Sequence, residues 1–297
     1  MPHLHHATSG SPQSLFFTVI IVPTALVYLR GWLSLRSKPL KVISPWRAFS
    51  FLVGLLLIWV AVASPIAALD HELLTVHMLQ HLLLMTLAPP LIWSGAPVRP
   101  FLRGLPPRFA EGLFVPMRQY RAAKEFAQVF GRPKFALLAA SAVLVGWHIP
   151  TFFTLGMQSL GWHLFEHLSF LATGLLFWWP VIQPTTGAFP QDFSMILYLF
   201  LATLPCDILS GFLAFSDRVV YPMYYSSSHL LGFSPLVDQQ CAAALMWTCV
   251  TVVYFVVGGV LTMRLLSPQD APQASLVRSK SPGVGIPRSV SQSLEAL

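Results

Sequence analysis

Two histidines, His77 and His81, stand four positions apart within an apolar run that extends from 73 to 93. In a helix this spacing places both imidazoles on one face, about 6 Å apart along the axis. Met85 follows one turn later on the same stripe, and Asp70 stands seven residues before His77. Ionisable side chains inside a bilayer cost about 2.5–3.5 kcal/mol each on insertion scales, so the stripe predicts a binding site. The alternative is that both imidazoles hydrogen-bond to backbone or hydroxyl groups of neighbouring helices.

A second set of imidazole and carboxylate side chains follows in another apolar run. His163, Glu166 and His167 share one helix face because they are spaced i, i+3 and i+4. They either bind a ligand directly, orient the residues that bind it, or satisfy one another as a polar cluster.

Three further residues in or beside apolar runs are candidates for the same site. His148 ends one run, Asp207 lies inside another, and Asp238 opens the last one. Asp207 is alternatively a hydrogen-bond partner or a residue that stabilises a helix kink. Asp238 alternatively caps the helix that it opens, because an acid is favoured at a helix N-terminus.

The residue types narrow the choice of ligand to a metal. Imidazole suits zinc, copper and iron, whereas thioether and thiolate groups favour Cu(I). Met85 lies on the histidine stripe, and Cys206 and Cys241 lie at a similar predicted depth, so we expect copper, as Cu(I), with zinc as the alternative. A bis-histidine haem is less suitable, because two histidines one turn apart would compete for the same iron.

The elements that must position these side chains are membrane-spanning helices. The chain of 297 residues is 55% hydrophobic and only 10% charged, against about 25% charged in soluble domains. A span needs about 20 apolar residues. We therefore predict an all-α membrane protein with seven transmembrane helices, at 14–33, 48–66, 73–93, 135–151, 162–182, 193–215 and 240–263.

The positions of the basic residues predict the orientation. Of 18 Lys and Arg, all except Arg218 fall in or beside the first connection, in the third connection, or after the seventh span. This pattern predicts an N-terminus outside and a cytoplasmic C-terminus, and it accounts for the net charge of +7 without nucleic acid as a partner. The candidate site residues then all lie in the outer half of the membrane.

The same division gives three segments. Residues 1–13 form an extracytoplasmic tail, 14–266 a seven-span membrane domain and 267–297 a disordered cytoplasmic tail. Within the membrane domain, the connection 94–134 is a cytoplasmic loop, and a short interfacial helix is expected at 107–130.

Several motifs, over residues 15 to 265, resemble one known family. They are the following: His77-Met78-Leu79-Gln80-His81, Ala88-Pro89-Pro90-Leu91, Gly95-Ala96-Pro97, Trp147-His148-Ile149-Pro150, His163 to His167 with Trp178-Trp179, and Asp238-Gln239-Gln240. In this order they resemble the multi-span CtaG-type cytochrome c oxidase assembly factors of bacteria, which differ from the single-span copper chaperone that shares the name. Cys241, directly after the last motif, departs from the family pattern.

The resemblance implies a multi-pass protein of the bacterial cytoplasmic membrane that matures haem–copper oxidase and has a role in copper supply. Its implied partners are oxidase subunits or other copper chaperones, besides the lipid bilayer. Together with the residues this predicts copper bound in an outer-facing cavity, first by His77 and His81 and next by His163 and His167. Glu166, Asp207 and Asp238 would orient imidazoles or balance charge.

Two other functions remain open at this stage. One is a seven-span zinc hydrolase, in which the metal would generate a hydroxide near neutral pH. The other is a metal-free scaffold for oxidase assembly, in which the histidines only pack helices together.

Overall fold

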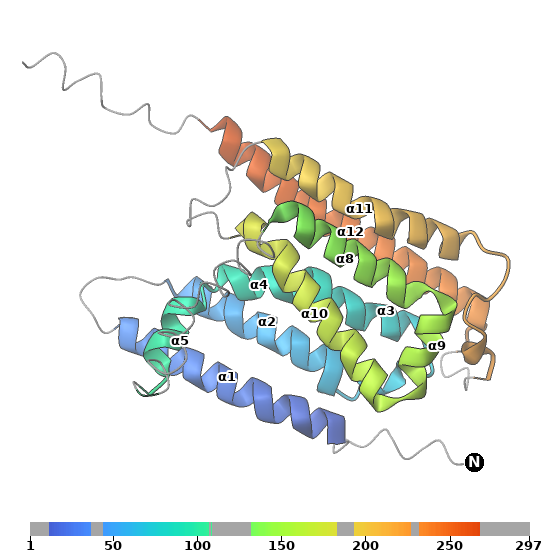
Figure 1. Cartoon of the computed structure of the whole chain (residues 1–297), viewed down its shortest axis with the longest axis horizontal. Coiled ribbons are helices and arrows are strands. Elements are labelled where there is room, and N and C mark those ends of the chain that lie inside the picture. Colours follow the sequence, from blue (N-terminus) through green and yellow to red (C-terminus); the bar gives the residue numbers. More distant parts are fainter. Residues whose placement is uncertain are drawn as a thin grey trace, which may run out of the picture.

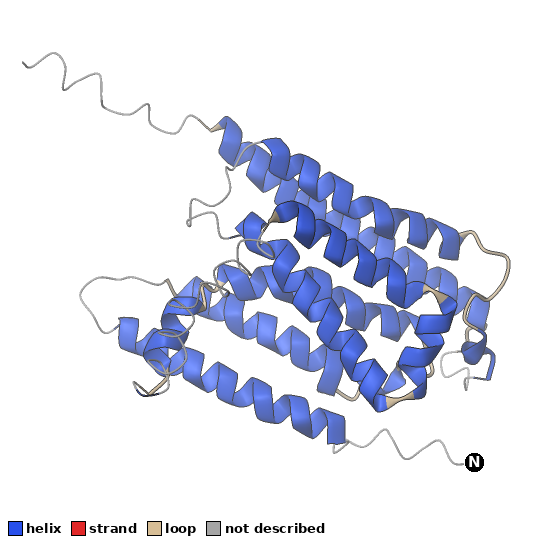
Figure 2. Ribbon diagram, viewed as in Figure 1, coloured by secondary structure: helices blue, strands red, loops and turns tan. Residues whose placement is uncertain are grey.

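The computed structural model describes residues 12–36, 44–106, 108, 132–182, 193–226 and 232–267 (Figure 1). Within these ranges all regular structure is helical, as Figure 2 shows, in agreement with the predicted fold class. The α-helices are α1 (Pro12–Arg36), α2 (Pro45–Ala63), α3 (Leu74–Leu82), α4 (Ala88–Ser94), α5 (Val98–Gly104), α8 (Pro133–His148), α9 (Pro150–Gln158), α10 (Leu160–Ile182), α11 (Phe193–Ala214) and α12 (Pro235–Leu266). Shorter elements are the 3-10 helices η1 (Ala67–Leu69) and η4 (Pro222–Ser226) and the π-helix η2 (Leu83–Leu87).

Six helical segments of the described chain are long and apolar enough to cross a membrane, or seven if one bent pair counts as a span. The bent pair is α8 and α9, whose axes differ by 78°. The prediction of one span over 135–151 was therefore wrong at its C-terminal end. The helix ends at His148 because Ile149, which precedes Pro150, takes an extended conformation with ψ of 127°, as residues before proline prefer.

The third span changes its helical type in the middle. It runs through α3, η2 and α4, and η2 lies just before the Pro89-Pro90 pair that begins α4. Pro89 has no N–H to donate to the carbonyl of Met85, and the indole Nε1–H of Trp178 donates to that carbonyl instead, at 3.1 Å. A Cβ at Gly174 would lie 2.8 Å from Cα of Met85, so glycine is what allows α10 to pack this closely on η2.

α3 lies inside the bundle, where it packs against α12, α2 and α10. α1 with α5 forms one side of the molecule, and α11 with α12 forms the opposite side (Figure 1). The N-terminal end of α1 and the C-terminal end of α12 lie at opposite ends of the bundle (Figure 1). α3, α10 and α12 all begin at the end of the bundle where α1 begins, which we call the α9 end because α9 lies there.

Several predicted segments lie outside the described residues. They are the tail before Pro12, most of the 94–134 connection with its expected interfacial helix at 107–130, and the tail after Ser267. Two parts of these regions are described: α1 begins already at Pro12, and α5 follows α4 within the 94–134 connection.

Candidate metal centre

The centre of the site is a carboxylate between two imidazoles. Glu166 Oε1, from α10, lies 3.5 Å from Nε2 of His77 and 3.3 Å from Nε2 of His81, both on α3. His77 and Glu166 are 0% exposed and His81 is 4% exposed. One ligand atom from each of these residues lies within 4.8 Å of one from each of the other two, so the three could hold one metal ion. We call them the inner group.

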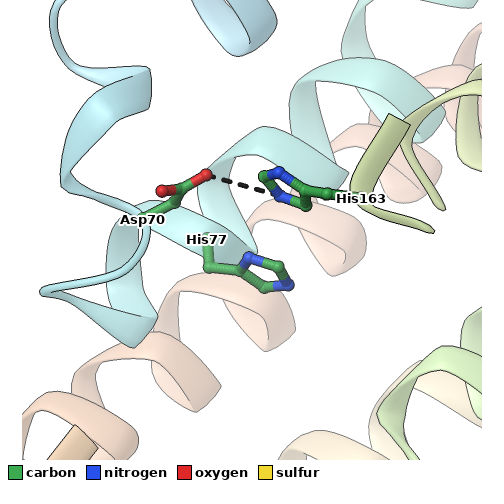
Figure 3. A group of neighbouring side chains, drawn as sticks. All are labelled: Asp70, His77 and His163. Carbon is green, nitrogen blue, oxygen red and sulfur yellow. Dashed lines mark ion pairs between the residues drawn. The ribbon is translucent and has the colours of Figure 1, made fainter. Parts of the chain in front are cut away.

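A second set of donors adjoins the inner group and shares His77 with it. Asp70, His77 and His163 also offer ligand atoms within 4.8 Å of one another, and all three residues are buried. Asp70 Oδ2 lies 3.4 Å from Nε2 of His163 (Figure 3), and the His77 and His163 rings stack with centroids 5.9 Å apart. We call Asp70, His77 and His163 the outer group.

Two more imidazoles border the inner group. His167, one turn after His163, has its ring centroid 6.1 Å from that of His81. The His148 ring lies 5.7 Å from that of His81. His148 Nδ1 lies 2.7 Å from the Leu144 carbonyl, and its Nε2 lies 3.1 Å from Sδ of Met78. The thioether of Met78 therefore lies beside the imidazoles of this site.

The inner group and its neighbours hold most of the buried polar atoms that have no hydrogen-bond partner in the described chain. Of 12 such side-chain atoms, all but those of Trp32 and Asp207 belong to this region. They include both ring nitrogens of His77, His81 and His167 and both oxygens of Glu166. Unpaired buried polar groups are rare in native proteins and cost about 1–3 kcal/mol each. An ion bound between them would satisfy several of these atoms at once.

Asp238 positions the helix that carries the two histidines. Its carboxylate accepts hydrogen bonds from the N–H groups of Leu74 and Thr75, at 2.6 and 3.2 Å, and from the Thr75 hydroxyl at 2.6 Å. Asp238 therefore caps α3 and not its own helix, whose N-cap is Ser234. The alternative considered for Asp238, a cap of its own helix, was therefore wrong, because the carboxylate accepts from the free N–H groups at the start of a neighbouring helix.

The connection between α11 and α12 covers the site at the α9 end. The Tyr221 hydroxyl donates to the His148 carbonyl at 2.9 Å, and the Tyr224 hydroxyl donates to the Asp70 carbonyl at 2.8 Å. Burial raises the pKa of Tyr224 well above its ordinary value, and the Asp70 charge raises it further, so the hydroxyl stays protonated as a donor. Gln239 fixes this connection by accepting from the Val220 N–H and donating to the Leu213 carbonyl.

Two predicted site residues lie elsewhere in the structure. Asp207 is half-buried on α11, which packs mainly on α12 and α8, and it belongs to neither donor group. Met85 lies on η2, where π-helical geometry departs from the regular spacing that would extend the His77 and His81 stripe. The thioether that contacts an imidazole is that of Met78.

Asp70 and Met78 are the residues whose importance the sequence did not establish. Asp70 stands on the histidine stripe by spacing alone, but it lies before α3 and reaches His163 because η1 turns the chain there. In the sequence nothing distinguishes Met78 from the other apolar residues of its span. Its neighbour His148 comes from the end of α8, so only the tertiary structure identifies the pair.

The fold and this centre define the class: a multi-pass helical membrane protein with a buried histidine–carboxylate cluster near one end of its spans. The profile of the cytochrome c oxidase caa3 assembly factor family (Caa3_CtaG) matches residues 26–267. The chain belongs to this family, which confirms the resemblance inferred from the motifs.

Two uncharacterized proteins, from Mycobacterium bovis and Mycobacterium tuberculosis, are each 26% identical to the chain over 237 residues. The match covers 76% of this chain but 35% of each relative, so the chain spans about a third of the length of these curated relatives. No solved structure matches the chain.

Proposed function

We propose that this protein is an assembly factor for haem–copper cytochrome c oxidase that binds copper at the inner group and aids its supply to the oxidase. The family supports the role in oxidase assembly. The observation that supports a metal is the concentration of unpaired buried polar atoms at His77, His81, Glu166 and His167.

A metal explains these atoms better than helix packing does. Histidines that only hold helices together would be expected to donate to or accept from a neighbouring group. Here Nε2 of His77 and Nε2 of His81 both converge on one carboxylate oxygen, without hydrogen-bond geometry to it. Nitrogen and oxygen atoms that point at one another without forming hydrogen bonds are arranged as ligand atoms are around an ion.

The residue types favour copper over other ions. For a given set of nitrogen and oxygen ligands, Cu²⁺ binds more tightly than Zn²⁺ or Fe²⁺, and a thioether favours Cu(I). The Met78 thioether stands beside His148 at the border of the site. A group of three ligands leaves a coordination position open, which suits a protein that must release the ion that it binds.

We also propose that the site faces the outside of the bacterial cytoplasmic membrane. Several basic residues lie at the end of the bundle opposite the α9 end: Arg36 of α1, Lys134 of α8 and Arg264 of α12. By the positive-inside rule the end that carries these basic residues is cytoplasmic, so the α9 end, with the site and the start of α1, is outside. Oxidase subunits or other copper chaperones are the partners that this position would serve.

The test is the metal content of the protein purified in detergent and measured by mass spectrometry after loading with Cu(I) and, in parallel, with Cu(II). We expect about one copper per chain in the wild type, a loss in His77→Ala/His81→Ala, and retention in Asp217→Asn, which removes an exposed acid outside both donor groups. Zinc retained in preference to copper, and lost in the same double variant, would indicate a metal hydrolase. No metal in the loaded wild type would contradict the proposal and leave a metal-free scaffold.

A further inference from the structure

The histidine–carboxylate cluster extends from the buried inner group to the surface of the protein. His71, in the connection before α3, has a side chain that is 54% exposed. Its Nε2 lies 3.8 Å from Asp70 Oδ1, and its ring centroid lies 5.9 Å from that of His163. Asp70 and His163 belong to the outer group, whose third member, His77, also belongs to the inner group.

We propose that this sequence of residues is the access route of the metal ion, with the outer group as a second binding position that shares His77 with the inner one. The inference rests on the proposed function. The ion would be met by His71, held by Asp70, His163 and His77, and then passed to His77, His81 and Glu166. His77 is a ligand of both positions, through one ring nitrogen at each, so the ion passes from one to the other across a single imidazole and does not have to return to water inside an apolar bundle.

The two nitrogens of His77 make the shared position possible. Nε2 faces Glu166 Oε1 at 3.5 Å, and Nδ1 is buried and has no hydrogen-bond partner. In Figure 3 one ring nitrogen of His77 lies on the side toward Asp70 and His163, and the other lies farther from them. In this proposal Nε2 serves the inner group and Nδ1 serves the outer group.

The shared ring also limits the site to one ion at a time. A neutral imidazole has one lone-pair nitrogen, and the other nitrogen carries the proton. When the ion leaves Nδ1 for Nε2, the proton on Nε2 is released to solvent by way of Glu166 Oε1, which lies 3.5 Å away, and Nδ1 takes up one proton from solvent, so the ring carries a single proton in both states. Binding at one position thus removes the lone pair from the other, so the two positions are successive stations and not a two-metal centre.

Hydrogen bonds around Asp70 hold the outer group in place but engage only one of the two carboxylate oxygens. The Gln80 amide donates to Asp70 Oδ2 at 3.3 Å and to the Ala67 carbonyl at 3.2 Å. Tyr224 donates to the Asp70 backbone carbonyl. Asp70 Oδ1, on the side of His71, is left to face the exposed imidazole.

The test is the rate of Cu(I) uptake by the full chain in detergent, followed by stopped flow as the protein removes Cu(I) from a coloured chelate. We expect Asp70→Asn and His163→Gln each to slow uptake by about tenfold or more, while both still reach one copper per chain. His81→Gln should keep a fast first phase and lose affinity at equilibrium. Asp217→Asn, which removes an exposed acid from the connection after α11, is the control and should take up copper at the wild-type rate.

The outcomes separate the two proposals. A wild type that takes up no copper would overturn the proposed function and the route together. Normal uptake by the wild type with unchanged rates in both outer-group variants would overturn the route alone. Two copper ions per chain at saturation would contradict the sharing of His77. Asp70→Asn and His163→Gln alter different elements, so a folding defect in one, detected by its thermal unfolding, leaves the other as the test.

Discussion

The contact between the third span and α10 has two halves, which differ in whether their polar side-chain atoms have hydrogen-bond partners. Away from the α9 end, Trp93 Nε1 donates to the Leu175 carbonyl at 2.8 Å and Trp178 Nε1 donates to the Met85 carbonyl at 3.1 Å. Nearer the α9 end, His77, His81 and His167 have ring nitrogens without hydrogen-bond partners in the described chain. Trp178 and His77 are both 0% exposed, so burial alone does not explain the contrast.

The contrast shows which polar residues are there for packing. In the first half both indoles donate to carbonyls of the facing helix, and Trp178 satisfies the Met85 carbonyl that Pro89 leaves free, so they stabilise the fold directly. In the second half the residues that position α3, above all Asp238, are also fully bonded. Among the described residues of this half, the buried side-chain atoms without a partner belong to His77, His81, His163, His167 and Glu166, together with Oε1 of Gln80. Polar groups held in place by bonded neighbours, yet unbonded themselves, are typical of a ligand site.

The largest effect on stability should follow the loss of the Asp238 carboxylate. In Asp238→Ala the N–H groups of Leu74 and Thr75 and the Thr75 hydroxyl lose their acceptor. Since bonds to charged groups contribute about 1.5–3 kcal/mol, we expect unfolding to become easier by roughly 2–4 kcal/mol, and copper affinity to fall because α3 is no longer fixed. Thermal unfolding in detergent measures the first effect and metal titration the second. If Asp238→Ala kept both the thermal stability and the copper affinity of the wild type, Asp238 would not position α3, and the distinction between positioning residues and ligands would be wrong.

A smaller pair of effects should have opposite signs in the two halves. Trp178→Phe leaves the Met85 carbonyl without its donor and should destabilise the metal-free protein by about 1–3 kcal/mol. His167→Leu removes two unpaired buried nitrogens and should leave the metal-free protein as stable as the wild type, or more stable. Parallel thermal unfolding of the two variants without metal is the measurement. Equal destabilisation by both would mean that the histidine contributes to packing as the tryptophan does.

Local spacing was enough to predict that His77 and His81 share a face and that His163, Glu166 and His167 share another. Hydropathy was enough to place most spans within a few residues. The pairing of these faces across α3 and α10 depended on tertiary structure, as did the cap that Asp238 provides for a helix start 164 residues earlier. The bend at Pro150 and the π-helix at η2 were also missed in detail, because both arise where a proline forces neighbouring residues out of regular geometry. The first of these departures ended the fourth helix at His148, and the second placed Met85 in a π-helix, outside the regular spacing of the stripe.

The most direct test of the account is the X-ray absorption spectrum of the copper-loaded wild-type chain at the copper edge. If copper binds at the inner group, the nearest ligands should be nitrogen and oxygen, with the outer-ring scattering of imidazole from His77 and His81, and this pattern should be lost in His77→Ala/His81→Ala. A sulfur-dominated set of ligands without imidazole scattering would contradict the account, because it would place the ion at the cysteines or methionines and leave the unpaired imidazoles unexplained.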